Sequence, residues 1–171
     1  MPYIYFVFIN DNMALHKLLV DDFYDDTYVL IAVHCRLEDY RLAYMINKYF
    51  GINLERKEKD LDLNYTSSSY SVYEWYNEAN DTIWNLIANI CKKEEESITS
   101  SGVLFIDDKK VTKTYNLLPE LKQVDYFIKI TNDTHQVNEK LIISKLQSIP
   151  HIITSYTVDL TKIKSKEHLI F

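Results

Sequence analysis

The chain has 171 residues, 47% of them hydrophobic, which is enough for one domain with a sizeable buried core. Its formal net charge of −6 disfavours non-specific binding to nucleic-acid phosphates, because such binding requires cationic contacts. Two glycines are too few for the phosphate-binding loops of nucleotide enzymes, and the G-x-S-x-G turn of serine hydrolases is absent. No apolar run approaches the ~20 residues that a membrane-spanning helix needs.

The N-terminal region has two open interpretations. The apolar stretch from Tyr3 to Ile9 has no basic residues before it and no small-residue cleavage site after it, which disfavours a secretory signal. It is either an extra edge strand or translated sequence upstream of the natural start. Residues 14–20 predict a strand, and the aspartates between residues 21 and 26 are more typical of a solvated turn than of a metal site.

The next segment predicts a strand, a helix and a second strand. Residues 28–35 form a continuous apolar run, which is typical of a central strand. Residues 38–50 begin with two acidic residues, carry an apolar stripe at helical spacing and are followed by Gly51, a common residue at helix ends. Residues 54–63 are highly charged, which predicts an edge strand or a strand with one solvated face.

The middle of the chain predicts an antiparallel meander. Apolar and polar residues alternate over residues 70–76 and again over residues 84–90. Residues 92–101 are polar and are expected to form a connection, and residues 103–106 and 111–117 are expected to pair as a hairpin.

The last third repeats the strand, helix and strand pattern, with a strand at 126–130, a helix at about 137–149 and a strand at 152–160. Two such units, at residues 28–63 and 124–160, place their helices on a shared sheet. The sequence therefore predicts an α+β fold with an antiparallel-rich sheet and two strand–helix–strand units. The expected architecture is a ferredoxin-like or similar two-layer sandwich with an inserted β-meander.

The residues that commonly bind metals or act as nucleophiles form no recognisable site. Cys35 and Cys91 lie in no paired motif and are interpreted as reduced core thiols, with a disulfide or a nucleophile as the alternative. Burial of Cys35 in an apolar strand would raise its pKa rather than activate it. No histidines form a helical pair with zinc-ligand spacing. We therefore expect no metal and no cofactor, and assign no catalytic residue.

Two short segments hold the candidate pocket or interface residues. The start of the first helix contributes Glu38, Asp39, Tyr40 and Arg41, and the segment around Pro119 contributes Glu120, Asp125 and Tyr126. In a structural interpretation, Pro119 presets a turn, Asp125 accepts backbone amides where the chain enters a strand, and Tyr126 is a packed ring. In a functional interpretation the same side chains line a pocket.

Residues 118–126, with the sequence Leu-Pro-Glu-Leu-Lys-Gln-Val-Asp-Tyr, resemble the signature of the bacterial I-P-E-x-x-x-V-D-Y family. Leu118 replaces the isoleucine of that signature, and residues 37–44 and 84–89 are also similar to the family. The resemblance extends over most of the chain and implies a bacterial cytoplasmic protein. The family has no assigned activity, cofactor or catalytic residue, so the resemblance implies no site.

Members of this family begin near the equivalent of Met13. The resemblance therefore implies that residues 1–12 are an N-terminal extension and that residues 13–171 form a single α+β domain.

The sequence leaves several classes of function open. The first is a non-catalytic cytoplasmic module that binds a protein partner or a second copy of itself, because catalytic motifs are missing and sheet aromatics are abundant. A small-ligand-binding regulatory domain is an alternative, although no glycine follows Cys35 to let a ligand approach the helix. An RNA-associated factor using Arg36, Arg41 and the basic C-terminal tail is a further alternative. Another is an enzyme of unrecognised type using carboxylates and Tyr126. We expect no membrane partner, and the net acidity disfavours nucleic acid.

Overall fold

A computed structural model describes four stretches of the chain, residues 28–63, 68–96, 110–132 and 137–171. Several predictions made from the sequence concern residues outside these stretches, namely the extension at 1–12, the strand at 14–20, the aspartate turn at 21–26 and the strand at 103–106.

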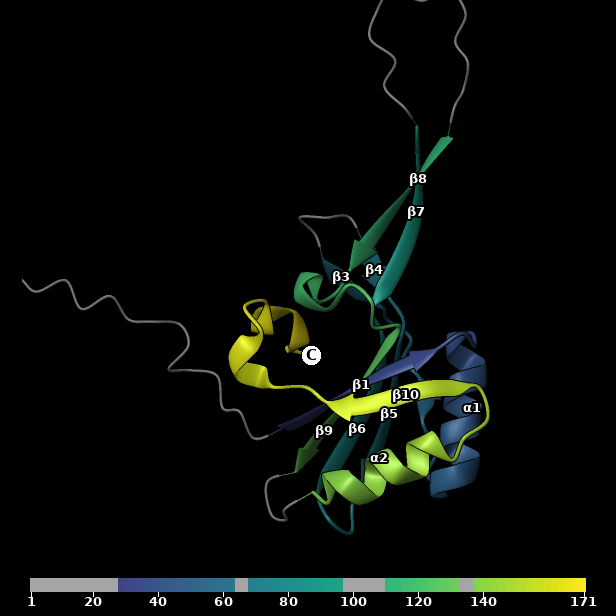
Figure 1. Cartoon of the computed structure of the whole chain (residues 1–171), viewed down its shortest axis with the longest axis vertical. Coiled ribbons are helices and arrows are strands. Elements are labelled where there is room, and N and C mark those ends of the chain that lie inside the picture. Colours follow the sequence, from purple (N-terminus) through teal and green to yellow (C-terminus); the bar gives the residue numbers. More distant parts are fainter. Residues whose placement is uncertain (1–27, 64–67, 97–109, 133–136) are drawn as a thin grey trace, which may run out of the picture.

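The centre of the fold is a six-stranded sheet in the order β10-β1-β9-β6-β5-β2, with every neighbouring pair antiparallel (Figure 1). In that order the strands are Ile152–Thr157, Tyr28–Cys35, Tyr126–Asn132, Thr82–Ala88, Val72–Asn77 and Glu55–Arg56. The side chains of residues 30–33 are fully buried, as expected for a strand between two neighbours. The predicted α+β fold with an antiparallel-rich sheet is confirmed.

Both α-helices cover one face of this sheet, as the two strand–helix–strand units predicted (Figure 1). Helix α1 (Asp39–Phe50) buries Leu42 and Ile46, and α2 (Glu139–Gln147) buries Ile142 and Leu146 against sheet residues such as Ile31. Helix α1 ends at Gly51, whose φ of 68° is the left-handed conformation that glycine adopts without strain. Neither these helices nor the shorter ones in the described stretches are long and apolar enough to cross a membrane.

The opposite face of the sheet is also covered, which the predicted two-layer arrangement did not include. Its cover consists of the small sheet β3–β4 (Leu61–Leu63 and Ser68–Tyr70) and the 3-10 helices η2 (Pro119–Leu121), η3 (Leu160–Lys162) and η4 (Lys166–Leu169). Tyr70, Leu118 and Leu169 from this cover form one buried cluster with Leu30 and Phe127 of the sheet. The chain uses these short segments because β1 is apolar on both faces and Phe127 of β9 faces the same side as Leu30.

The charged segments differ from their prediction. Residues 54–63 do not form one edge strand, because β2 is only two residues long and β3 pairs with β4 in a separate sheet. The predicted polar connection at 92–101 is wrong in its first part, since β7 (Ile90–Glu96) pairs with β8 (Lys110–Asn116). Because this hairpin extends away from the sheet into solvent, its strands need no apolar face and carry no hydrophobic alternation (Figure 1).

Asn89 connects the sheet to the segment that precedes β9. Its side chain is 0% exposed, and its Oδ1 accepts a hydrogen bond from the Leu118 amide at 2.9 Å. Its Nδ2 donates to the carbonyl oxygens of Leu121 and Val124, at 2.9 and 2.8 Å. The buried polar atoms of the turn between η2 and β9 are therefore satisfied by one side chain.

Replacing this side chain should destabilise the fold strongly. Asn89→Ala leaves the Leu118 amide and the Val124 carbonyl without partners, while the Leu121 carbonyl keeps its hydrogen bond from the Val124 amide. Each buried group left without a partner costs roughly 1–3 kcal/mol, so we expect a loss of at least about 2 kcal/mol. Urea unfolding followed by circular dichroism measures this loss. Asn53→Ala is the control, because the exposed Asn53 bonds only to Glu55 at the surface. A loss in Asn89→Ala no larger than in this control would contradict the assignment.

Candidate functional site

Most of the predicted site residues meet at the end of the sheet where β1 finishes and β9 begins. Two pockets of about 320 and 410 Å³ lie there and share Ala88, Ile90, Lys92 and Tyr126. The smaller one is also lined by Cys35, Arg36, Leu37 and Asp125, and the larger one by Glu38, Asp39, Asp60 and Cys91 together with serines. We call these two connected pockets the polar groove.

Asp125 connects the start of β9 to the end of β1. Its Oδ2 accepts a hydrogen bond from the Cys35 amide at 2.9 Å, across 90 positions of sequence. The predicted role of Asp125 as a backbone cap is correct, but the capped amide belongs to β1 rather than to the local turn. The bond forms here because the β1–β9 ladder ends at the pair of Val33 and Tyr126, which leaves the Cys35 amide without a partner in β9.

Tyr126 fixes the connection between β1 and α1. Its hydroxyl group donates a hydrogen bond to the Leu37 carbonyl oxygen at 2.6 Å. Burial raises the pKa of Tyr126, and the nearby Asp39, Cys35 and Asp125 raise it further. The hydroxyl is therefore a neutral donor at physiological pH and is poorly suited to act as a general base.

The carboxylates of the larger pocket already have partners. Glu38 Oε2 accepts from the Tyr40 hydroxyl at 2.7 Å and lies 3.5 Å from Arg41 Nε. Asp60 pairs with Arg56. Asp39 accepts a hydrogen bond from its neighbour's amide and another from the hydroxyl of buried Tyr73. Burial and this carboxylate raise the pKa of Tyr73, so Tyr73 also remains neutral.

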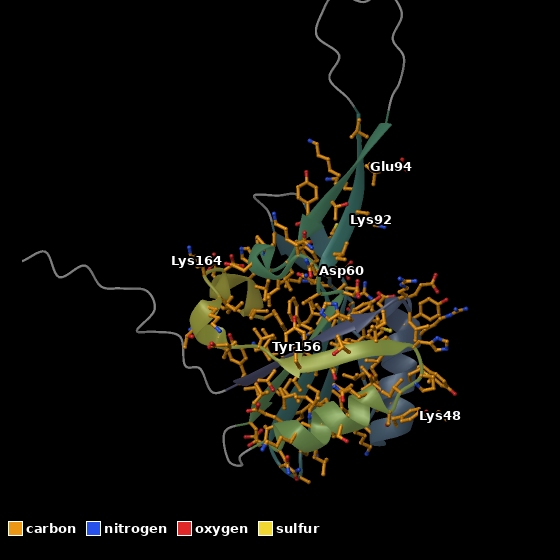
Figure 2. The ribbon with its side chains drawn as sticks, in the orientation of Figure 1. Lys48, Asp60, Lys92, Glu94, Tyr156 and Lys164 are labelled. Carbon is orange, nitrogen blue, oxygen red and sulfur yellow. The ribbon has the colours of Figure 1, made fainter. Side chains whose placement is uncertain are left out.

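The cations of the smaller pocket have no such partners. Arg36 and Lys92 are both exposed, and within the described stretches neither side chain makes an ion pair or a hydrogen bond. Figure 2 labels Lys92 on the projecting hairpin and Asp60 near the point where that hairpin leaves the sheet. The polar groove therefore combines carboxylates that have partners with two cations that make no ion pair, and Lys92 lines both of its pockets.

The Cys35 thiol is placed for packing rather than for reaction. It is only 2% exposed, and burial raises its pKa, so the nucleophilic thiolate is scarce. Its sulfur accepts a hydrogen bond from the Leu37 amide at 3.4 Å. Cys35 and Cys91 are both free, and no cluster of three or more metal-ligating side chains occurs in the described part of the chain.

Tyr40 and Arg41 lie on the other flank of α1. They line a pocket of about 490 Å³ together with Leu37, Tyr44, Met45 and His151, and we call this set of six residues the tyrosine surface. The side chains of Tyr40 and Tyr44 are 55% and 64% exposed and project one helical turn apart. Leu37 belongs to both the polar groove and the tyrosine surface, so the two sites meet at the start of the helix.

Glu120 is not part of either site. Its Oε1 accepts hydrogen bonds from the Lys164 amide, the Ser165 amide and the Ser165 hydroxyl at 3.0, 3.1 and 3.0 Å. Burial alone would raise the pKa of Glu120, but these bonds and one from its own amide lower it overall. This carboxylate holds the C-terminal segment against the sheet cover.

The sequence analysis missed Lys92, Tyr73, Tyr44 and His151. Tyr44 follows Tyr40 by one helical turn, so helical periodicity could have placed it on the same exposed face. Lys92 lines the groove from β7 and Tyr73 of β5 interacts with Asp39, and both positions depend on strand register, which local patterns do not determine.

Removing the Tyr126 hydroxyl should weaken the start of α1. Tyr126→Phe keeps the ring but leaves the Leu37 carbonyl without its donor, and we expect a loss of about 1–2 kcal/mol in the free energy of unfolding. Amide hydrogen exchange should also become faster in the first turn of α1. Tyr76→Phe is the control, because Tyr76 is exposed and its hydroxyl bonds to Asp81 at the surface. Equal losses in the two variants would contradict a specific role for Tyr126.

The contacts of Glu120 should make stability depend on pH. A pKa lowered by folding means that the ionised carboxylate stabilises the folded state above the unfolded pKa of about 4.3, and that this stabilisation is lost as the pH falls through the folded value. We therefore expect the stability difference between the wild type and Glu120→Gln to shrink as the pH is lowered from 6 toward about 3. Urea unfolding across this range, with Glu167→Gln as the control, measures it. A difference that stays constant with pH would contradict the assignment.

No protein-family model matches the chain, and comparisons with curated proteins and with solved structures found no match either.

Proposed function

We propose that the protein is a non-catalytic binding module that associates with a second copy of itself through the tyrosine surface. The observation that carries this proposal is the pair of large exposed rings, Tyr40 and Tyr44, beside a pocket of about 490 Å³. Tyrosine, arginine and methionine are enriched in protein interfaces, and all three residue types occur on this surface.

The tyrosine surface is partly ordered before any partner binds. The Tyr40 hydroxyl bonds to Glu38, Arg41 pairs with the same carboxylate, and the Arg41 guanidinium lies 5.9 Å from the centroid of the Tyr40 ring. These contacts restrict the rotamers of two long side chains, and side chains that are already restricted lose less entropy on association.

Self-association is favoured over a different partner because the surface is complementary to itself. A two-fold axis makes each copy present the same patch, so a residue of one copy meets a different residue of the other. Arg41 of this surface and the neighbouring Glu38 are paired within one copy, and a two-fold axis can place each of them near its counterpart in the other copy as well. Tyr44 projects from the same patch that is hollowed beside Met45 and His151, so one copy carries both a projection and a recess.

The β10 edge of the sheet is a weaker candidate for association than the tyrosine surface. The amide of Gln147 on α2 donates to the Ser155 carbonyl oxygen at 3.2 Å and so occupies one acceptor of this strand. Pairing of β10 with another strand would displace that contact. Covering an edge in this way is a common means of preventing strand addition.

The alternative functions find less support. An enzyme would need reactive groups in a cleft, but Cys35 is buried, the pKa of Tyr126 is raised, and Glu38 and Asp60 of the larger pocket are paired with arginines. An RNA-associated factor would need a continuous basic surface, but Arg36 and Arg41 line different pockets and Arg41 is paired with a carboxylate.

We also propose a ferredoxin-like arrangement for the sheet and its helices. Strands β1, β6, β9 and β10 with α1 and α2 follow the strand–helix–strand, strand–helix–strand plan of that fold. Segments β2–β5 and β7–β8 are then insertions into it.

Membership of the I-P-E-x-x-x-V-D-Y family and a place in the bacterial cytoplasm remain proposals. They are supported by the specific contacts of Glu120, Asp125 and Tyr126 and by the free state of both cysteines.

Tyr44→Ala should weaken self-association without weakening the fold, because Tyr44 is exposed on a helix and alanine is a good helix former. We expect a concentration-dependent dimer in the wild type and a dissociation constant raised at least about tenfold in the variant. Sedimentation equilibrium measures both. Tyr76→Ala, which removes a 51% exposed tyrosine on β5, is the matched control and should leave the dimer unchanged. A wild type that is monomeric at about 100 μM would overturn the proposal.

A further inference from the structure

The smaller pocket of the polar groove holds two cations that make no ion pair with any described residue. Arg36 follows β1 and Lys92 lies on β7, so folding brings them to one pocket of about 320 Å³ from distant parts of the sequence. The other two arginines of the chain, Arg41 and Arg56, are each paired with a carboxylate. In a chain with a net charge of −6, two unpaired cations in one pocket are available for an external anion.

The neighbouring carboxylates do not neutralise Arg36 and Lys92 because they already have hydrogen-bonding or ion-pair partners. Glu38 binds Tyr40 and Arg41, and Asp60 binds Arg56. Asp125 is the one carboxylate that lines the smaller pocket, and one of its oxygens is occupied by the Cys35 amide. Among the described residues, the pocket therefore presents two positive charges and one negative charge, which favours a ligand with a carboxylate for the cations and a hydrogen-bond donor for Asp125.

The remaining walls fit a small carbon skeleton. Leu37, Ala88, Ile90 and the ring of Tyr126 give the pocket apolar surfaces between its charged groups. A volume of about 320 Å³ is at the small end of the range for organic ligands. Inorganic phosphate would leave these walls uncovered and would place a second negative charge near Asp125.

We propose that this pocket binds a small organic carboxylate that also carries a hydrogen-bond donor, an amino acid or a hydroxy acid. Its carboxylate lies between Arg36 and Lys92, where charge-assisted hydrogen bonds to a guanidinium and an ammonium hold it. Its amino or hydroxyl group donates to the second oxygen of Asp125, and its carbon skeleton contacts Ile90 and Tyr126. This ligand site is separate in chemistry from the proposed dimer surface and goes beyond that function.

The experiment tests binding to the full chain with a defined panel of probes, consisting of the standard L-amino acids, glycolate and L-lactate, with inorganic phosphate and ethylammonium as comparisons. We expect at least one amino or hydroxy acid to raise the melting temperature, since binding to the folded state stabilises it. Nuclear magnetic resonance should show shifts in the amide signals of Ala88, Ile90 and Tyr126 on addition of the same compound.

Charge-removing variants then locate the site. Arg36→Gln and Lys92→Gln should each weaken the affinity for that compound at least about tenfold, because each removes one ionic hydrogen bond. Both residues are exposed and make no side-chain contacts of this kind, so these variants should fold normally. Lys122→Gln, an exposed lysine outside the groove, is the matched control and should bind like the wild type.

Three results would overturn the proposal. The first is that no amino or hydroxy acid of the panel binds. The second is that the affinity is the same in Arg36→Gln, Lys92→Gln and the wild type. The third is that inorganic phosphate binds as tightly as the best carboxylate, which would make the pocket a site for inorganic anions.

Discussion

The hydrogen bonds of Asp125 and Tyr126 determine where β1 ends and where α1 begins. One joins the Asp125 carboxylate to the Cys35 amide at 2.9 Å, and the other joins the Tyr126 hydroxyl to the Leu37 carbonyl at 2.6 Å. These bonds hold the backbone on both sides of Arg36, at Cys35 and at Leu37. Arg36 therefore lines the polar groove, and the first turn of α1 places Tyr40 in the tyrosine surface on the other flank. The two proposed binding sites depend on this one geometry.

The segment from Leu118 to Tyr126 therefore has a structural role, because its polar atoms form hydrogen bonds that hold the backbone in place. The Leu118 amide and the Leu121 and Val124 carbonyls bond to Asn89, whose own amide donates to the Asp125 carbonyl at 2.9 Å. Such a segment has few polar atoms left for chemistry. It instead positions residues from other parts of the chain, which explains why the residues proposed to bind a ligand lie outside it.

The structural features that could be predicted from the sequence are those that depend on the local pattern of apolar and polar residues. The strand at 28–35 and both helices were placed within two residues, because burial on both sides requires a continuous apolar run and a helix requires apolar residues at helical spacing. The β7–β8 hairpin was missed because its charged strands are specified by pairing and not by hydrophobic pattern. The same limit applies to the site. The position of Lys92 in the groove depends on strand register, and Glu120 bonds to Ser165, which is 45 positions away in the sequence.

The charges around the start of α1 separate into a paired set and an unpaired set, and this separation gives the groove its chemical character. Exposed pairs such as Glu38 with Arg41 add little to stability, about 0–1 kcal/mol each. Their larger effect is local, because a carboxylate that is already neutralised attracts Arg36 and Lys92 less strongly. Without those pairs the two cations would have nearby carboxylates to bind. Arg36 and Lys92 stay available because Glu38 and Asp60 are paired with Arg41 and Arg56, while Asp39 and Asp125 accept hydrogen bonds from the amides of Tyr40 and Cys35.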